Sequence, residues 1–453
     1  MSDLETLAMA SGAEVARAFA RGEASPIALT EFLLERINKQ TSPVFLTVTA
    51  ERARREAEAA ETRIRAGNTL SPLDGVPIAW KDLTDIEGEV TTAASDIYRN
   101  APPATEDAPI VVNAAAAGMV SLGKVNLTEF AYSGLGLNPH FGTPHNPHSE
   151  VPRSPGGSSS GSGVSVAGGM APIAMGTDTG GSVRIPAAFN GVVGYKSSEK
   201  RIDKSGVFGL SDTLDTVGPL ARSVEDCVLT DAIFRGAIGS NVRRQPLDKL
   251  KIFVPQSVVF DGIEDAVAAN FELSLERLAM AGATIRRDAC PAFQRAAELA
   301  GEIGTITAAE AYASHRALMD GDDINRIDAR VVARIELGRK MIAGDYIRLF
   351  EERHALQAAL SEQLDGWLMA LPTAPHVAPE IAPLEADVDL FHATNLKTLR
   401  NTAIGNYLNL PGVAIPSGVD DAGMPTSFLL AAEADDDDRL LGHALTAEPV
   451  IRG

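Results

Sequence analysis

The feature that most constrains the fold is a glycine-rich stretch in the middle of the chain. Residues 153–194 hold 11 glycines in 42 positions, whereas the whole chain holds 40 in 453. Glycine adopts positive φ angles and lets other groups approach the backbone closely. A flexible linker would also be rich in glycine, but a helix-like apolar run at 164–167 and a strand-like run at 171–175 lie inside this stretch. We therefore predict tight turns within a folded centre.

Short apolar runs alternate with helical patterns on both sides of this centre. The serine and proline at 25–26 are typical of a helix start. A helical pattern at 108–117 precedes the apolar run 119–123, and the run 251–254 precedes a helix around 271–281. This alternation predicts an α/β fold in which helices cover a sheet.

No linker separates these segments, so we predict a single domain over residues 1–453. Residues 1–68 indicate an N-terminal helical layer, and residues 69–240 form the core around the glycine-rich stretch. Residues 241–453 indicate a C-terminal α/β part with a helical excursion at about 301–360.

Composition excludes several classes of function. The chain carries 40 Lys and Arg against 60 Asp and Glu, a net charge of −20, which disfavours broad binding to nucleic acid or to an anionic membrane surface. Cys227 and Cys290 are too few for a disulfide framework and predict buried free thiols. A signal-peptide pattern and a run of about 18 apolar residues are both absent, so we expect a cytoplasmic protein with a small-molecule partner. The acidic run 433–438 predicts a solvated loop.

Ser182 is the first candidate for chemistry, because two glycines directly precede it in the segment 176–187. Such glycines let consecutive backbone N–H groups converge on one point, as an oxyanion hole requires. None of the eight histidines stands in a familiar triad context, and no GxSxG elbow frames this serine. The histidines of the segment 140–148 lie among Gly and Pro residues, which favours a turn-rich loop over a metal site.

A different base is available in Lys81, which follows an apolar strand-like run beginning at Gly75. Partial burial would lower the pKa of this lysine and make its neutral form accessible. The alternative, taken on this signal alone, is a surface lysine at the end of a strand.

Three separated motifs then occur in one order: Lys81 after its strand, the turn 156–159, and the segment 176–182. Together they resemble the amidase signature family, which includes fatty acid amide hydrolase, malonamidase, aryl acylamidases and the glutaminase subunit of tRNA-dependent amidotransferases. The 24 residues from Ser158 to Ser182 match the spacing of the family's two catalytic serines.

The resemblance covers about residues 10–445 and includes the segments 123–131, 214–223 and 371–375. It departs from the family at 423–430, where a glycine and a Gln-rich strand would be usual. This departure puts the geometry of a late strand and the pocket wall in doubt, while the centre of the site is unaffected.

The resemblance implies an amidase signature fold, a large mixed sheet with helices on both faces. It implies that Ser182 is the nucleophile that forms an acyl-enzyme, that Ser158 relays a proton from a cis peptide after Gly157, and that Lys81 is the base. The backbone N–H groups expected to hold the oxyanion belong to Thr179, Gly180, Gly181 and Ser182.

Three further residues are expected to support this site. Ser159 would do so by hydrogen bonding, and Asp178 by ordering its own loop. Arg184 would fix the loop after the nucleophile; the alternatives are a salt bridge to Asp178 without a catalytic part, and a carboxylate-binding role toward a dicarboxylic monoamide.

The acyl pocket is expected in variable loops and in the helical region 301–360. Its candidate residues are Tyr132, Ser133, Gly134, Leu135, Phe208 and Leu210. These are small or largely apolar, which favours aryl or alkyl amides, with carbamates and esters as further candidates.

No cofactor and no metal are expected, and the chain is expected to be a monomer or a homodimer. The alternative function is the glutaminase subunit of a tRNA-dependent amidotransferase complex, which would need partner subunits. A non-catalytic scaffold is disfavoured because Lys81, Ser158 and Ser182 are all present.

Overall fold

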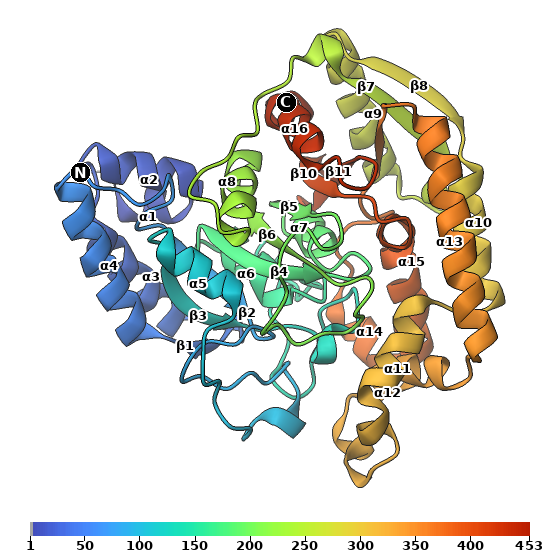
Figure 1. Ribbon diagram of the computed structural model, residues 1–453, viewed down its shortest axis with the longest axis horizontal. Helices are drawn as coiled ribbons and strands as arrows, with labels where there is room; N and C mark the ends of the chain where they lie inside the picture. Colours follow the sequence, from blue (N-terminus) through green and yellow to red (C-terminus); the bar gives the residue numbers. More distant parts are fainter. Residues whose placement is uncertain (1–2) are drawn as a thin grey trace.

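The computed structural model describes residues 3–453, in which eleven strands form one mixed sheet (Figure 1). The strand order is β1-β3-β2-β4-β6-β5-β10-β11-β9-β7-β8. The strands are β1 (Phe45–Val48), β2 (Pro77–Lys81), β3 (Val120–Val125), β4 (Ile173–Asp178), β5 (Val193–Lys196), β6 (Thr216–Ala221), β7 (Lys251–Gln256), β8 (Thr284–Ala289), β9 (Leu368–Pro372), β10 (Gly412–Val419) and β11 (Pro425–Ala431). The predicted α/β fold with a large mixed sheet is confirmed.

Sixteen α-helices within residues 3–453 surround this sheet. They are α1 (Leu4–Ala8), α2 (Gly12–Ala20), α3 (Pro26–Asn38), α4 (Ala50–Arg65), α5 (Pro109–Ala116), α6 (Ser160–Ala167), α7 (Arg184–Phe189), α8 (Val224–Phe234), α9 (Asp265–Met280), α10 (Pro291–Glu302), α11 (Ile306–Met319), α12 (Ala329–Arg339), α13 (Ala343–Leu364), α14 (Ile381–Ala386), α15 (Val388–Tyr407) and α16 (Asp437–Arg452). Helix α16 packs against α8, α9 and β10, and α7 packs against α6, α15 and the strands β5 and β10.

The two strands that end at Lys81 and Asp178, β2 and β4, are parallel to each other. β2 pairs in parallel with β3 on one side and with β4 on the other, where Ile78 lies opposite Ile173. Because the carboxyl ends of parallel strands meet at one edge of a sheet, the last residues of β2 and β4, Lys81 and Asp178, are brought to the same edge.

The N-terminal part contains the expected helices and one additional strand. Ser25 caps α3 by accepting a hydrogen bond from the Ala28 N–H, at 3.2 Å, and α4 ends at Arg65 before Gly67 with its φ of +72°. The strand β1 pairs antiparallel with β3 and forms one edge of the sheet, so this part is not wholly helical.

Helices α11, α12 and much of α13 lie within 301–360, the region of the expected helical excursion (Figure 1). The segment 425–431, which departs from the family pattern, forms the regular strand β11 between β10 and β9. Cys227 and Cys290 are buried free thiols, as predicted. Within residues 3–453, none of the helices combines the length and the apolar character needed to cross a bilayer.

The prediction of a solvated loop at 433–438 is wrong for its fifth residue. Asp437 is fully buried and begins α16. Its carboxylate accepts hydrogen bonds from the hydroxyls of Tyr195 at 2.5 Å and Ser198 at 2.6 Å. Hydroxyl donors from another part of the chain thus allow an acidic side chain to be buried, which the local sequence does not reveal.

Candidate active site

The three residues expected to act together lie at the edge where β2 and β4 end. Lys81 is the last residue of β2, Ser158 lies in the turn before α6, and Ser182 lies between β4 and α7. The Gly157–Ser158 peptide bond is cis, as the resemblance implied. Lys81 and Ser158 are fully buried, and Ser182 is 5% exposed.

The Lys81 amine contacts two hydroxyl groups. Its Nζ donates hydrogen bonds to Ser158 Oγ and to Thr177 Oγ1, each at 2.7 Å. Burial lowers the pKa of Lys81 to about 7, although the negative charges of Asp215 and Asp178 act in the opposite direction. A lysine in this state can both take up and release a proton near neutral pH.

Asp178 contacts the loop that carries Ser182. Its carboxylate accepts hydrogen bonds from the N–H groups of Gly181 at 2.8 Å and Val183 at 3.1 Å. It also forms an ion pair with Arg184, whose Nε lies 3.0 Å from Oδ2. Burial alone would raise the pKa of Asp178, but the Arg184 guanidinium holds it well below its usual range, so this carboxylate stays ionised.

Arg184 is directed at Asp178 and does not line the cavity beside Ser182. The side chain is 1% exposed, and its Nη2 also donates to Asn406 Oδ1 at 2.5 Å and to the Thr402 carbonyl at 3.3 Å. The geometry of Arg184 therefore corresponds to the alternative in which it forms a salt bridge to Asp178. A carboxylate-binding role for Arg184 has no support, because all these contacts are internal.

Gly181 has a conformation that other residues rarely adopt. Its φ is +135°, and a Cβ atom here would lie 2.2 Å from Thr402 Oγ1. Since its N–H donates to Asp178, this group is already engaged. Of the four N–H groups expected in the oxyanion hole, those of Thr179, Gly180 and Ser182 remain candidates.

Ser159 links the two serine-bearing loops. Its N–H donates to the Ser182 carbonyl at 3.3 Å, and its hydroxyl donates to the Thr177 carbonyl at 3.4 Å. The supporting role expected for Ser159 stays a prediction.

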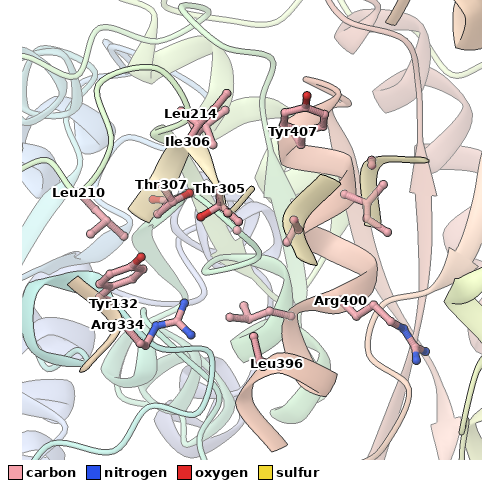
Figure 2. A pocket seen from close by; sticks show the side chains of 18 of the residues that line it. Tyr132, Leu210, Leu214, Thr305, Ile306, Thr307, Arg334, Leu396, Arg400 and Tyr407 are labelled. Carbon is pink, nitrogen blue, oxygen red and sulfur yellow. The ribbon is translucent and has the colours of Figure 1, made fainter. Parts of the chain in front are cut away.

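A cavity of about 290 Å³ opens beside Ser182 (Figure 2). Thr179 and Gly180 line it next to the serine, and so do Tyr132, Ser133 and Leu210, three of the six residues proposed from sequence for the acyl pocket. Three other predicted lining residues lie elsewhere: the Gly134 N–H donates to Asn395, Leu135 packs in a separate apolar cluster, and Phe208 stacks on Phe130.

Most of the cavity wall was not predicted residue by residue. It comes from the end of α10 and the start of α11 (residues 296–307), from Arg334 of α12 and from residues 396–407 of α15. The region 301–360 was expected to contribute, and it supplies 304–307, Arg334 and Leu349. The α15 residues reach the cavity through tertiary packing alone. No local sequence motif therefore marks them as lining residues.

Within residues 3–453, no cluster of three or more His, Cys, Asp or Glu side chains is suited to hold a metal ion. The histidines of the segment 140–148 take part in local contacts: His140 Nε2 lies 3.2 Å from Glu129 Oε2, and His148 Nε2 lies 2.9 Å from the Asn190 carbonyl. These contacts fit the turn-rich loop that the sequence predicts.

Comparison with known proteins finds relatives along almost the whole chain. The family model described as Amidase matches residues 28–441. The 2-amino-5-chloromuconic acid deaminase of Comamonas testosteroni is 34% identical over 411 residues, which cover 88% of this chain and 87% of that protein. The A-type subunit of the glutamyl-tRNA(Gln) amidotransferase of Roseiflexus sp. (strain RS-1) is 32% identical, and the match covers 94% of this chain and 93% of that protein. A crystal structure of an amidase aligns with a TM-score of 0.86 at 29% identity, over 97% of this chain and 99% of that one.

Proposed function

The chain belongs to the amidase family and is a hydrolase of amide C–N bonds, and we propose that it cleaves small aryl and alkyl amides through Ser182, Ser158 and Lys81. The observation that carries this proposal is the hydrogen bond of 2.7 Å between the buried Lys81 amine and Ser158. Carbamates and esters would be further substrates of the same chemistry.

The reaction begins with two proton transfers. Neutral Lys81 takes a proton from Ser158, which takes one from Ser182, and Ser182 Oγ attacks the amide carbonyl carbon. The N–H groups of Thr179, Gly180 and Ser182 stabilise the negative oxygen of the tetrahedral intermediate. The proton then returns along the same chain to the leaving nitrogen, the C–N bond breaks, and water hydrolyses the acyl-enzyme.

The character of the cavity wall supports the proposed substrate class. Alanine, leucine and isoleucine side chains of α10, α11 and α15 form most of it. An aryl or alkyl group would bury apolar surface there, at about 25 cal/mol per Å². Within residues 3–453, the lining of the cavity contains no acidic side chain that would repel an anionic substrate.

A second candidate function is the glutaminase subunit of an amidotransferase complex. The similarity to the Roseiflexus amidotransferase protein, which extends over 94% of this chain, favours it. A protein of this kind would need partner proteins and would hydrolyse simple amides poorly when purified alone.

Hydrolysis by the purified chain tests the proposal. The panel contains an anilide, a primary aryl amide, an aryl carbamate, a malonic monoamide and glutamine. We expect turnover of the first three and its loss by a factor of about 10⁴ or more in Ser182→Ala, in line with nucleophile replacements in serine hydrolases.

Ser160→Ala is the matched control, because this buried hydroxyl lies near Ser158 and has no hydrogen-bond partner within residues 3–453. It should keep most of the activity. Turnover of glutamine alone, or of nothing, would reject the proposal and favour the role in an amidotransferase complex.

A further inference from the structure

The cavity contains one cation that no protein group neutralises. Two arginines line it, Arg334 and Arg400. Arg400 donates to the carbonyls of Asp261 at 2.7 Å and Val259 at 3.2 Å, and its guanidinium points away from the cavity (Figure 2). Within residues 3–453, Arg334 forms neither an ion pair nor a hydrogen bond, and its Nε is buried without a partner.

The lack of a partner distinguishes Arg334 from its neighbours on α12. Arg330 pairs with Asp328 at 2.7 Å, and Arg339 pairs with Asp320 at 2.6 Å. A donor such as the Arg334 Nε–H, buried without an acceptor, destabilises a protein because it has lost its hydration. A ligand that supplies the acceptors would remove this cost.

Arg334 is held in place by packing. Its Cζ lies 4.5 Å from the centroid of the Tyr132 ring, and Tyr132 is 4% exposed. Figure 2 shows the guanidinium directed into the cavity beside this ring. A cation over an aromatic face is attracted by the ring while its N–H edges stay available, so Tyr132 orients the group without satisfying its donors.

The helix that carries Arg334 is also anchored to the segment that carries Tyr132. The Glu129 carboxylate accepts a hydrogen bond of 2.6 Å from the Asp328 N–H, at the start of α12. At the other end, Gly338 lies so close to α11 that a Cβ atom would be 1.9 Å from the Ala308 carbonyl oxygen. The position of the guanidinium is therefore fixed before a ligand binds.

The planar guanidinium has paired N–H donors that match a carboxylate. The chain as a whole carries a net charge of −20 and does not attract anions generally. A local cation is therefore needed if an anionic substrate is to enter this cavity.

We propose that Arg334, oriented by Tyr132, binds a carboxylate of the substrate, so that the preferred substrates are amides that carry a carboxylate at one end. This inference rests on the proposed amidase function and narrows it. The apolar wall holds the body of the substrate, and Ser182 reaches the amide carbonyl. The carboxylate belongs either to the acyl part or to the leaving amine.

Binding tests the site without requiring turnover. Calorimetric titration of the Ser182→Ala protein would use glutarate and adipate, the neutral diamides of both acids, and 4-acetamidobenzoate. We expect at least one of the carboxylates to bind, and Arg334→Gln to weaken it by about 10- to 100-fold, the worth of a hydrogen bond to a charged group. Arg339→Gln, on the same helix but paired at the surface, should leave binding unchanged.

Two outcomes of the titration would overturn the proposal. One is that none of the carboxylates binds. The other is that Arg334→Gln weakens the diamides as much as the acids, which would mean that Arg334 only supports the Tyr132 ring.

Turnover then identifies the source of the carboxylate. With Ser182 intact, glutaric monoanilide carries the charge on the acyl side, 4-acetamidobenzoate carries it on the amine side, and butyranilide is neutral. We expect one of the charged compounds to have the higher kcat/KM, and Arg334→Gln to remove that advantage through KM. Equal losses on all three would contradict the proposal. If carboxylates bind but nothing is hydrolysed, the amidase proposal fails while the carboxylate site stands.

Discussion

The floor of the cavity and its wall are built in opposite ways. The floor is defined as Lys81, Ser158 and residues 177–184; within it Lys81 donates hydrogen bonds to Ser158 and Thr177, and Asp178 pairs with Arg184, all of them buried. The wall consists of residues from α10, α11, α12 and α15, which are mostly apolar and include one unpaired guanidinium. The floor therefore determines which bond is attacked, and the wall determines which molecule is held there.

The contrast is clearest between two arginines. Arg184 in the floor is satisfied by Asp178, at 3.0 Å, and by Asn406. Arg334 in the wall has no such partner within residues 3–453. A satisfied buried charge maintains local structure, whereas an unsatisfied charge facing a cavity is available to a ligand.

Two buried lysines on neighbouring strands also differ in whether an acidic side chain pairs with them. Lys124 of β3 forms an ion pair with Asp82 at 2.7 Å and donates to the Val90 carbonyl at 2.8 Å. Within residues 3–453, the Lys81 amine of β2 hydrogen-bonds only to hydroxyl groups, and burial lowers its pKa to about 7. Both are fully buried, so the two sites differ in their partners, a carboxylate for Lys124 and hydroxyl groups for Lys81.

The largest effect is expected from replacing each lysine by methionine. Lys81→Met should lower kcat by about 10²–10⁴-fold, the usual contribution of a general base. Its cost in stability should be modest, about 1–3 kcal/mol for two hydroxyls that lose a donor. Lys124→Met should instead lower the free energy of unfolding by about 3–5 kcal/mol, because it leaves Asp82 buried and unpaired.

Urea unfolding and steady-state kinetics on the folded proteins separate these effects. The two variants are each other's control, since each removes one buried amine from neighbouring strands. A Lys81→Met protein that retains wild-type kcat would remove this lysine from the mechanism, even if its stability changed as expected.

The second-largest effect expected is a dependence of kcat/KM on pH. Because neutral Lys81 is the active form and its pKa is about 7, kcat/KM for a neutral amide should rise about tenfold per pH unit below that value and level off above about pH 8. Asp178 should contribute nothing to this profile, since its pKa lies far below the range.

Rates measured between about pH 5.5 and 9 on an uncharged anilide check the profile, with the stability of the protein followed over the same range. A flat or falling profile would contradict the assignment of Lys81 as the base. A carboxylate-bearing substrate should give the same midpoint, because an ordinary carboxylate stays ionised over this whole range.

The fold could be predicted where local patterns determine it. The serine and proline at 25–26 start α3, the apolar run at 119–123 overlaps β3, and the run at 251–254 lies within β7. The edge strand β1 was missed because its four residues show no clear alternation of buried and exposed side chains. Asp437 was placed wrongly because its burial depends on hydroxyls more than 230 residues away.

The floor could be located from sequence, whereas the wall could not. Lys81, Ser158 and Ser182 lie in three motifs of the family, and the structure brings their segments to one sheet edge. Arg334 lies four residues after Arg330 in a helix with several arginines. Only tertiary packing shows which of them lacks an acceptor.

The smallest effect is expected from Gly338→Ala, which changes the wall and leaves the floor intact. A Cβ at this position would lie 1.9 Å from the Ala308 carbonyl oxygen, so α11 and α12 must separate. Overpacking of this kind typically costs about 1–3 kcal/mol of stability. Since Arg334 moves with α12 while Lys81 and Ser158 do not, KM should rise a few-fold for a carboxylate-bearing amide and kcat should change little.

Gly301→Ala is the matched control for this change. It adds the same methyl group near the end of α10, where no atom lies within 4 Å of the new Cβ, so stability should be unchanged or higher by up to about 1 kcal/mol. Urea unfolding and the separate values of kcat and KM measure both variants. If Gly338→Ala lowered kcat as much as it raised KM, the floor and the wall would be mechanically coupled, and the division of roles between them would have to be abandoned.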